Sequence, residues 1–500
     1  MIPLVIGIDS GSTATKVAVY RPDGSVVATA SAPTPRSAAD SGRMERDAEL
    51  HWRSVAEVVA RVVSLPGVDA RSIRAVGITA QGDGLVLIDS TGDPIGPAIL
   101  SSDSRATGVV DRWRDEGVLE TLLPVIGQTP FPGSPAALLS WIRDNQPERL
   151  EATRWMLSAK DWLRFRMTGE VATERTDAGA SFVDVTTQSY SPRAMELYGL
   201  SAWSHLLPPA LEPTDRAGTI TAEAALLLGV PEGVPVVAGL HDAIATLVGS
   251  VGLAPGSLCV IAGTFGVNVV LSRGPTISRS INSRPGPRAG LWAPRRTSRA
   301  SATNIDWAMS TLAGLGSSPS DWDAIDRALG RPPSPDGPIY LPYLFGGNEG
   351  QPGSASFFGL RNWHTSEDML RAVLEGITFG HRMDIERLVD EVAVSSTHIA
   401  GGASRNPAWL QLFADVLACP VSSAPGDEAG VRGAAMCAAV GAGFFDDLGT
   451  AAAAMLPSPV TFVPGDAAGV LDASYRAYVD ACALAAQFDR NRFAVPSLSP

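Results

Sequence analysis

A chain of 500 residues is long enough for two or more domains, since a domain usually takes about 100 to 200 residues, and its apolar content of 45% allows a substantial core. The net charge of -13 argues against a nucleic-acid or anionic-membrane surface, because either would need a basic field. Its four cysteines are widely spaced and show neither disulfide nor zinc spacing, which fits a reducing cytoplasm.

The sequence also lacks the marks of export or membrane insertion. Its start has no charged segment followed by an apolar core and a cleavage site. The uncharged stretch 433–445 is too short to span a bilayer and is rich in alanine and glycine, so it predicts a tightly packed core helix. Small molecules are therefore the expected partners, and the cytoplasm is the expected location.

The first motif is GIDSGSTATK at residues 7–16, between two apolar, β-branched runs. The pattern predicts a strand, a tight turn and a strand. Consecutive backbone N–H groups in such a turn can form an anion nest, and the carboxylate of Asp9 could hold a hard cation that the same anion shares. A hairpin turn made of ordinary turn residues is the alternative.

The following residues alternate between helical and extended patterns. Helices are expected around 48–63, 109–123 and 136–143, and strands around 75–79 and 85–88. This alternation is typical of an α/β protein. A turn, a strand and a small-residue helix follow in 231–250, and a domain boundary is expected there, near residue 240.

Residues 258–271, LCVIAGTFGVNVVL, repeat the plan of the first motif: an apolar strand, a Gly-Thr-x-Gly turn and another apolar strand. Two such hairpins suggest two related halves that each offer a phosphate-holding turn to a shared cleft. The sequence contains no Walker-type P-loop and no Rossmann glycine motif after a strand. If the chain binds a nucleotide, these hairpins must hold its phosphates.

Three further stretches have local interpretations. Residues 273–299 carry seven arginines and no acidic residue, and a solvated loop is favoured there over a subunit or substrate contact. Thr365 and Asp368 form a possible capping box before a long helix. Asn406 before Pro407 predicts a helix N-cap followed by proline at the first helical position.

Seven stretches, taken together and in order, resemble the FGGY family of carbohydrate kinases. They are GIDSGSTATK at 7, GITAQGDG at 77, SAKDWLRFRMTGE at 158, GLHDA at 239, AGTFGVN at 262, ASFFGLRNWHTSEDMLRAVLEGI at 355 and GGASRN at 401. The resemblance implies a two-domain, actin-like (ribonuclease H-like) α/β ATPase fold with a cleft between the domains. The expected domains are 1–240 and 241–492, followed by a flexible tail at 493–500.

The resemblance implies transfer of the γ-phosphate of ATP to a sugar or polyol hydroxyl, with Mg²⁺ as cofactor; it leaves a homodimer open. Matched to the family's motifs, Asp9 organises Mg²⁺, and Asp242 is the catalytic base. The residues expected to contact ATP are Ser12 and Thr13 in the first phosphate turn, Thr264 and Gly266 in the second, and Gly402, Ala403 and Asn406 at the adenosine.

The position of Asp242 gives the catalytic role a physical basis. It lies where a strand turns into a helix, and the helix dipole would favour the ionised carboxylate that must accept the hydroxyl proton. The alternative role is that of an N-cap aspartate, and the two roles are not exclusive.

Departures from the family pattern narrow the substrate. Gly82 and Asp83 stand where family xylulokinases have a Met-His pair, and Gly346, Gly347 and Asn348 replace a Gly-Glu-Arg. These changes and Ala137, which stands where many sugar and glycerol kinases have lysine, disfavour D-xylulose and glycerol. The chain is most similar to the L-xylulose and 3-keto-L-gulonate kinase branch, with erythritol and other polyol kinases as the alternative.

Four polar residues on two loops of the first domain are the expected substrate contacts: Gln81, Asp83, Asp103 and Arg105. Carboxylates and amides suit hydroxyl recognition, and Asp83 is the stronger candidate. Asp103 and Arg105 could instead pair with each other and brace their loop. A rival from another class is an ATP-binding switch or assembly protein, because the actin-like fold also serves such proteins.

Overall fold

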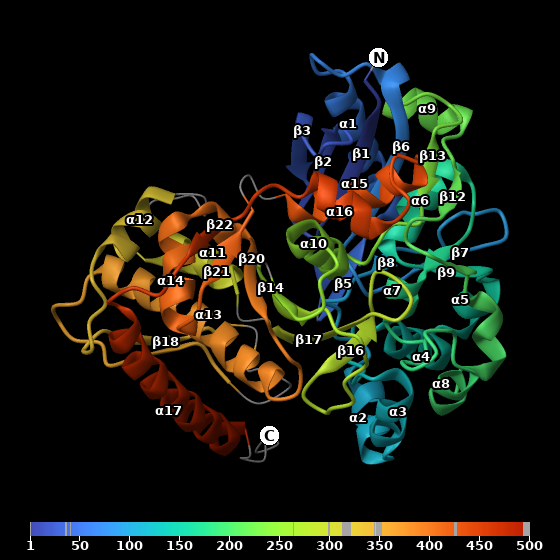
Figure 1. The fold of residues 1–500 in the computed structure, drawn as a ribbon. Coiled ribbons are helices and arrows are strands. Elements are labelled where there is room, and N and C mark those ends of the chain that lie inside the picture. Colours follow the sequence, from blue (N-terminus) through green and yellow to red (C-terminus); the bar gives the residue numbers. More distant parts are fainter. Residues whose placement is uncertain are drawn as a thin grey trace. The chain divides into compact units, whose positions relative to one another are not determined.

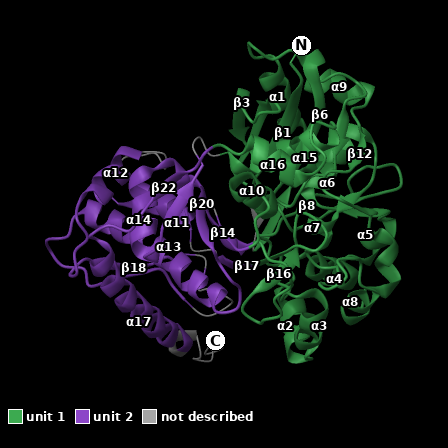
Figure 2. Ribbon diagram, viewed as in Figure 1, with its two compact units in different colours: residues 1–255, 271–294, 428–457 green, residues 256–270, 295–427, 458–500 purple. Residues whose placement is uncertain are grey.

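The computed structural model describes residues 2–35, 38–40, 42–263, 265–298, 301–312, 322–344, 346, 353–424 and 428–493. Thr264 therefore lies outside the described residues, as do Gly347, Asn348 and the predicted tail beyond Phe493. The described chain forms two compact units, shown in Figure 2. The first comprises residues 1–255, 271–294 and 428–457, and the second comprises 256–270, 295–427 and 458–500.

The first unit carries the N-terminal hairpin and most of the strands of the chain's first half. Its strands are β1 (Leu4–Ser10), β2 (Ala14–Tyr20), β3 (Val26–Pro33), β4 (Ala38–Asp40), β5 (Arg43–Arg46), β6 (Ile73–Ala80), β7 (Val86–Ile88), β8 (Ala98–Ile99), β9 (Trp155–Leu157), β10 (Thr173–Glu174), β11 (Ala210–Leu211), β12 (Arg216–Thr219), β13 (Pro235–Val237) and β16 (Asn282–Pro285).

The helices of the first unit include two from the C-terminal part of the chain. They are α1 (Ala48–Val63), η1 (Ala70–Ser72), α2 (Thr107–Asp115), α3 (Val118–Ile126), α4 (Pro135–Asn145), α5 (Pro147–Ala152), α6 (Ala159–Thr168), α7 (Arg175–Ala178), α8 (Pro192–Leu197), η2 (Ser201–Leu206), α9 (Ala222–Leu228), α10 (Asp242–Val251), α15 (Ala429–Gly441) and α16 (Leu448–Met455). In Figure 1 the orange α15 and α16 lie among the blue and green elements of this unit.

The second unit holds the second hairpin and the C-terminal helices. Its strands are β14 (Ser257–Ala262), β15 (Gly266–Val270), most of β17 (Trp292–Ser298), β18 (Ile339–Leu341), β19 (Ser356–Phe358), β20 (Ser396–Gly401), β21 (Val421–Ser423) and β22 (Val460–Phe462). Its helices are α11 (Thr303–Thr311), α12 (Trp322–Gly330), α13 (Ser366–Val389), η4 (Gly402–Arg405), α14 (Pro407–Leu417) and α17 (Ala468–Phe493).

The main sheets of the two units repeat one topology. The described strands of the first sheet run in the order β3-β2-β1-β6-β13-β12, and those of the second contain β17-β15-β14-β20-β21-β22. In both, the hairpin is antiparallel, its first strand pairs in parallel with the next strand in the order, and the last pair is antiparallel again. The two echoing sequence hairpins therefore occupy corresponding positions in two similar sheets.

Helix α15 packs closely against the first sheet because glycines remove side chains at the contact. A Cβ on Gly7 would lie 2.2 Å from the carbonyl oxygen of Val431, and one on Gly77 would lie 1.9 Å from that of Ala434. Gly7 and Gly77 are neighbours in register on β1 and β6. The predicted core helix at 433–445 is thus confirmed, with bounds shifted toward the N-terminus.

The contact-based division differs from the boundary expected near residue 240. Helix α10 stays with the first unit because it packs on α15, where a Cβ on Gly433 would lie 2.0 Å from the carbonyl oxygen of Ala245. Residues 271–294 join the same unit through β16, whose side chains reach Gln128 and Asp83. Asp242 therefore belongs to the unit that also contains Asp9.

The interpretation of residues 273–299 as a solvated loop is wrong for three of the arginines in the stretch. Arg284 on β16 and Arg295 and Arg296 on β17 are only 2%, 5% and 3% exposed. Arg296 forms an ion pair with Asp384 at 2.9 Å. Arg279 does fit the expectation of a solvated residue, because its side chain is 76% exposed.

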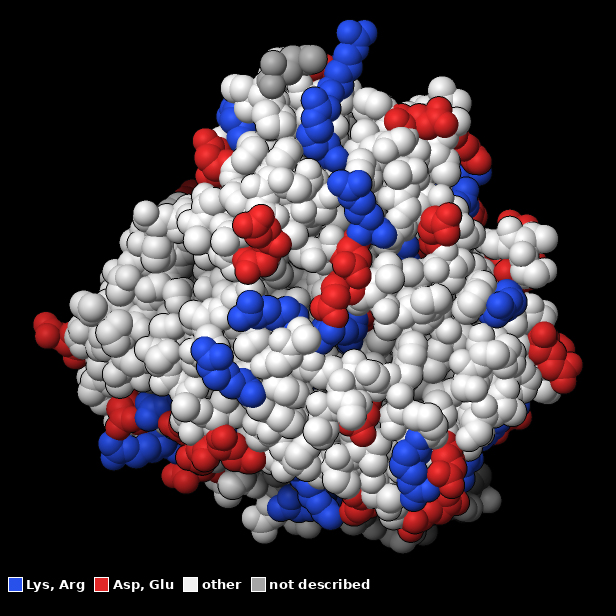
Figure 3. Space-filling view, turned by 45° about the vertical axis from the view of Figure 1, so that its right-hand side comes forward, with Lys and Arg blue, Asp and Glu red and all other residues white. Residues whose placement is uncertain are grey.

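The face drawn in Figure 3 shows acidic and basic side chains interspersed among a majority of uncharged residues. None of the described helices combines the length and apolar composition that crossing a bilayer requires. All four cysteines are free thiols, and Cys259 and Cys437 are buried.

Candidate active site

Asp242 begins α10, and the loop before it is held by contacts on several sides. Thr79 donates to the carbonyl of Leu240 at 2.6 Å, and the N–H of His241 donates to the hydroxyl of Thr176 at 2.9 Å. Gly239 has φ of +83°, and a Cβ there would lie 2.0 Å from the carbonyl oxygen of Ile78. The loop therefore requires glycine at 239 and places Asp242 on a preorganised backbone.

The carboxylate of Asp242 accepts several hydrogen bonds although its side chain is 40% exposed. Oδ2 accepts from the N–H of Gly82 at 3.2 Å, and Oδ1 accepts from the N–H of Ala243 at 2.7 Å. Burial opposes ionisation, but the interaction with His241 and these two N–H groups outweigh it and lower the pKa of Asp242. The N-cap itself is His241, so the alternative role as an N-cap does not apply to Asp242.

The first phosphate turn, which contains Ser12 and Thr13, is fixed by neighbouring polar groups. Arg46 donates to the carbonyl of Ser12 at 3.0 Å. Thr34 donates through its N–H to the carbonyl of Thr13 at 3.0 Å and through its hydroxyl to that of Gly11 at 2.9 Å. With these carbonyls engaged, the turn leaves the half-buried Ser12 and the exposed Thr13 at its tip.

Asp9 lies beside the start of α15 in a setting that disfavours its negative charge. Burial, together with the nearby charges of Asp242 and Glu428 and against the opposing effect of Lys16, raises the pKa of Asp9 to about 7. Lys16 itself pairs with Glu428 at 2.9 Å. Three carboxylates, those of Asp9, Asp242 and Glu428, therefore lie near one another, and the single positive charge of Lys16 does not balance them.

This surplus of carboxylates fits Mg²⁺, which prefers hard oxygen ligands and is commonly bound by one or two carboxylates together with substrate phosphates. The described residues contain no group of three or more His, Cys, Asp or Glu side chains able to hold a metal ion by themselves. A divalent ion shared with phosphates would offset the repulsion between Asp9 and Asp242. The donor set is therefore suited to a shared ion and not to a closed protein cage.

The predicted acceptor residues Gln81 and Asp83 follow β6, next to the first phosphate turn. The N–H of Gln81 donates to the carbonyl of Ser10 at 2.9 Å, and its Nε2 donates to the hydroxyl of Ser101 at 3.1 Å. Its Oε1 is buried and has no hydrogen-bond partner among the described residues. Asp83 has φ of +59°, a conformation that L-residues adopt at a cost.

Asp103 and Arg105 adopt the alternative arrangement and brace their loop. Arg105 donates from Nε to Oδ1 of Asp103 at 2.9 Å and from Nη2 to Oδ2 at 2.8 Å. Asp103 is fully buried and also accepts from the N–H of Met44, while Arg105 pairs with Glu45. Both oxygens of Asp103 are thus engaged within the protein.

Three residues that the sequence did not indicate connect Asp83 to Asp242. Arg284 lies 2.9 Å from Oδ1 of Asp83 and 3.1 Å from Nε2 of His241. Nδ1 of His241 lies 2.9 Å from Oδ1 of Asp242. Gln128 accepts from Nε of Arg284 at 2.9 Å. In the sequence, Gly82 and Asp83 differ from the Met-His pair of family xylulokinases. This difference marked the position but did not identify its partners, which are distant in the sequence.

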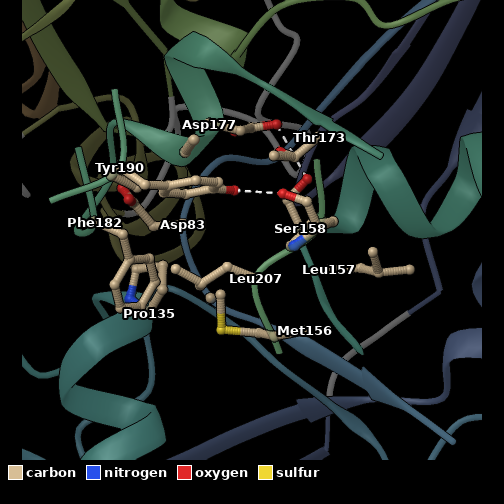
Figure 4. Close-up of a pocket in the computed structure, with 14 residues that line it drawn as sticks. Asp83, Pro135, Met156, Leu157, Ser158, Thr173, Asp177, Phe182, Tyr190 and Leu207 are labelled. Carbon is tan, nitrogen blue, oxygen red and sulfur yellow. Dashed lines mark hydrogen bonds between the residues drawn. The ribbon is translucent and has the colours of Figure 1, made fainter. Parts of the chain in front are cut away.

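A small cavity of about 30 Å³ lies behind Asp83 (Figure 4). Asp83, Ser158, Thr173 and Asp177 form its polar lining, and the remainder is largely apolar, as at Phe182. A polar cavity of this size holds about one or two waters. A cavity of this volume is too small to hold a sugar.

A buried charged cluster borders this cavity. Lys160 lies 2.6 Å from Asp161, 3.2 Å from Asp177 and 4.0 Å from Glu174. Burial opposes the charge of Lys160, but the three carboxylates outweigh it and raise its pKa. Burial raises the pKa of Glu174 to about 7, and Glu174 accepts from the hydroxyl of Thr176, which itself accepts from His241. The cluster thus supports the loop that carries Asp242.

Of the residues predicted to contact the nucleotide, the second unit holds Gly266, Gly402, Ala403 and Asn406, whereas the first unit holds Ser12 and Thr13. Thr264 lies outside the described residues. Ala262 and Gly401 are register partners at the ends of β14 and β20, so the second turn and η4 are neighbours. A Cβ on Gly402 would meet only the carbonyl oxygen of Ala262, at 3.6 Å. Gly266 and Ala403 lie at this same edge of the sheet.

Asn406 is confirmed as the N-cap of α14. Its Oδ1 accepts from the N–H of Trp409 at 2.8 Å, and its Nδ2 donates to Asp326 at 2.6 Å. Asn406 is 3% exposed, so its side chain has a structural role in this unit.

Comparisons with known proteins agree with this architecture. Residues 4–249 match the N-terminal domain of the FGGY family of carbohydrate kinases, and residues 258–442 match its C-terminal domain. The L-xylulose/3-keto-L-gulonate kinase of Escherichia coli (strain K12) is 30% identical, with 89% of this chain and 90% of the relative covered. The erythritol kinase of Brucella abortus (strain 2308) is 27% identical, with 88% of each covered.

A solved structure is similar over almost the full length. The xylulose kinase of Rhodospirillum rubrum has a TM-score of 0.83 and 28% identity, covering 97% of this chain and 100% of that one. The two-domain α/β fold expected from the sequence is thereby confirmed. With both family domains matched in order, this chain belongs to the FGGY family of carbohydrate kinases.

Proposed function

We propose that this carbohydrate kinase phosphorylates a ketose or polyol, with Asp242 as the base that accepts the proton of the attacking hydroxyl. The observation that carries the proposal is the state of Asp242. Its carboxylate stands at the start of α10, accepts two backbone N–H groups and has a lowered pKa, so it is ionised before the acceptor arrives.

The second carboxylate, that of Asp9, would act on the phosphates through Mg²⁺. Mg²⁺ bound there would neutralise charge that spreads over the transferred phosphoryl group. Asp9 would orient this ion, and the turn at Ser12 and Thr13 would donate backbone N–H groups to the phosphate oxygens. The high pKa of Asp9 without a cation supports this role, because a nearby divalent charge would favour its ionised form.

The adenosine and the second phosphate contact are assigned to the second unit. Gly266 and Thr264 would contact phosphate, while Gly402 and Ala403 would lie against the adenosine. The open space around Gly402 supports this assignment. Asn406 would shape that surface through its cap of α14, since its side chain is bonded within the protein.

The acceptor is assigned to the loop at Gln81 and Asp83. The unpartnered Oε1 of Gln81 and the carboxylates of Asp83 and Asp242 all accept hydrogen bonds, which suits hydroxyl donors. L-xylulose and 3-keto-L-gulonate are the first candidates because of the Escherichia coli relative's name, and erythritol is the alternative because of the Brucella relative's name. Asp103 and Arg105 would act indirectly, by fixing the neighbouring loop. A cytoplasmic location belongs to the same proposal.

The test is a coupled ADP-release assay of the purified protein with Mg-ATP and a panel of L-xylulose, D-xylulose, 3-keto-L-gulonate, erythritol and glycerol. Stimulation by L-xylulose or 3-keto-L-gulonate that is lost in Asp242→Asn supports the proposal. Stimulation confined to erythritol keeps the mechanism and replaces the first substrate. ADP release that no acceptor changes would favour the rival function, an ATP-binding switch.

A further inference from the structure

Arg284 makes three buried contacts that tie the acceptor loop to the residue before Asp242. Its side chain is 3% exposed. Nη2 lies 2.9 Å and 3.2 Å from the two carboxylate oxygens of Asp83, Nη1 lies 3.1 Å from Nε2 of His241, and Nε donates to Gln128 at 2.9 Å. Its guanidinium therefore uses all three nitrogens in contacts with residues far away in the sequence.

The contact with His241 determines where the imidazole carries its proton. A guanidinium is a donor without acceptor capacity, so Nε2 of His241 must accept from Arg284. In the neutral ring the proton then resides on Nδ1. Nδ1 lies 2.9 Å from Oδ1 of Asp242, so this N–H points at the carboxylate.

A competing donor near Nδ1 has a better acceptor. The N–H of Ala243 lies 3.3 Å from Nδ1 of His241 and 2.7 Å from Oδ1 of Asp242. The shorter contact, to a charged oxygen, is the stronger one. Both Ala243 and His241 therefore donate to Asp242, in agreement with the effect of His241 on the carboxylate.

The glycine at position 82 makes this arrangement sterically feasible. A Cβ on Gly82 would lie 2.1 Å from Nε2 of His241 and 2.5 Å from Cε1, so any side chain there would displace the ring. The N–H of Gly82 meanwhile donates to Oδ2 of Asp242. Gly82, Asp83, His241 and Arg284 thus fit one another as a set.

We propose that Arg284 is a positioning residue for phosphoryl transfer. It holds His241 with its Nδ1–H directed at Asp242, and it fixes the carboxylate of Asp83 in the loop to which the acceptor is assigned. This inference rests on the proposed function, in which Asp242 is the base. Loss of Arg284 removes a contact from the carboxylate of Asp83 and from the imidazole of His241, and it touches none of the residues assigned to the adenosine. It should therefore impair acceptor use selectively.

The variants are Arg284→Met and Arg284→Lys, with Arg279→Met as the matched control. Arg279 lies in the same arginine-rich stretch and unit, but its side chain is 76% exposed. A lysine retains the positive charge without the planar fork, so it cannot serve Asp83 and His241 together. Arg284→Lys thus separates the geometry of the fork from its charge.

In steady-state kinetics, kcat/KM for the acceptor should fall by about 100-fold in Arg284→Met, the scale expected when reacting groups are misplaced by about 1 Å. Arg284→Lys should recover little of this loss. The KM for ATP should stay within about twofold in both, and Arg279→Met should match the parent protein.

The second readout is ¹⁵N NMR of histidine-labelled protein, with the His241 signals assigned by their loss in His241→Asn. The parent protein should show His241 protonated on Nδ1 and unprotonated on Nε2. In Arg284→Met this pattern should give way to an averaged tautomer. Because this readout needs no turnover, it remains informative if no acceptor in the panel is phosphorylated.

The proposal is overturned if the parent protein shows His241 protonated on Nε2 alone, a result that requires no variant to fold. It is also overturned if folded Arg284→Met keeps both the kinetics and the tautomer of the parent. A parent protein with the expected tautomer but no acceptor-stimulated turnover would instead contradict the proposed function and leave the geometry of Arg284 supported.

Discussion

A base in phosphoryl transfer must be deprotonated when the acceptor binds and able to take up a proton as the bond forms. Asp242 is prepared for the first requirement by the N–H groups of Gly82 and Ala243 and by His241. Replacing it with asparagine keeps the size and removes the proton acceptor. In Asp242→Asn, kcat should fall by about 10²- to 10⁴-fold, the range that a positioned general base contributes.

The measurement is initial-rate kinetics with calorimetric binding of the acceptor alongside. Binding should change much less than kcat, because the amide still fills the position of the carboxylate. Asp111→Asn is the control, since that side chain is 52% exposed and belongs to a surface ion pair. Equal kcat in Asp242→Asn and Asp111→Asn would contradict the assignment of the base.

Gly239 and Gly117 separate two costs of adding a methyl group. Both have positive φ, +83° and +72°, but a Cβ at 239 would lie 2.0 Å from the carbonyl oxygen of Ile78, whereas one at 117 would have nothing within 4 Å. Gly117→Ala should lose about 1 kcal/mol of unfolding free energy from the left-handed backbone alone, and Gly239→Ala about 2–4 kcal/mol from backbone and overlap together.

Chemical denaturation of the two variants measures these losses directly. Because Gly239 also fixes the loop that leads to Asp242, its variant should lose kcat as well, while Gly117→Ala should retain it. Similar stability losses in the two variants would mean that the loop moves away from Ile78 easily. The preorganisation inferred for Asp242 would then be much weaker.

At the scale of elements, the cluster of Lys160, Asp161, Glu174 and Asp177 joins α6 and α7 to the loop before α10. Burial raises the pKa of Glu174 to about 7 from an ordinary 4.5. Glu174 therefore stabilises the fold most below its unfolded pKa. That contribution disappears as the pH rises through about 7, because the buried carboxylate must then ionise.

Glu174→Gln removes this titration. Relative to the parent protein, the variant should gain stability on the order of 1–3 kcal/mol between pH 5 and pH 8. Denaturation midpoints at several pH values measure the gain, with the exposed Glu151→Gln as control. If the stability of Glu174→Gln and of the parent protein changed with pH in parallel, Glu174 would not be the cause of the loss of stability as the pH rises. Asp9, whose pKa is also raised, affects both proteins equally.

Local patterns in the sequence predicted many of these elements. The helix expected at 48–63 is α1 with the same bounds, and the capping box of Thr365 and Asp368 begins α13. The helix expected at 109–123 is instead divided into α2 and α3, because Gly117 turns the chain with a positive φ. Hydrophobic spacing continued across this glycine, so periodicity alone did not reveal the break.

The site could be predicted in part for the same reason. Asp9 and Asp242 stand at ends of strands or helices, where motif and local geometry coincide. Arg284 could not be recognised, since its burial depends on Asp83 and Gln128, which are distant in sequence and supply its compensating contacts. An arginine-rich stretch without acidic residues has a solvated loop as its simplest interpretation, and only the tertiary partners reverse it.

At the scale of the whole molecule, each unit carries one hairpin turn next to a parallel neighbour strand. Both turns are proposed to contact the phosphates, whereas the acceptor is assigned to the first unit and the adenosine to the second. Asp83 in the first unit is a proposed acceptor contact, and Gly402 in the second unit is a proposed adenosine contact. Gly402 has ordinary backbone geometry and room for a methyl group, so Gly402→Ala should fold normally.

Crossed kinetics of Asp83→Ala and Gly402→Ala test this division. Asp83→Ala should raise the acceptor KM by about tenfold or more while leaving the ATP KM within about twofold, and Gly402→Ala should do the reverse. Two opposite, selective effects in one chain are difficult to obtain from general destabilisation, which would lower the active fraction and leave both KM values unchanged. If both variants raised both KM values equally, the assignment of separate acceptor and adenosine sides would be wrong.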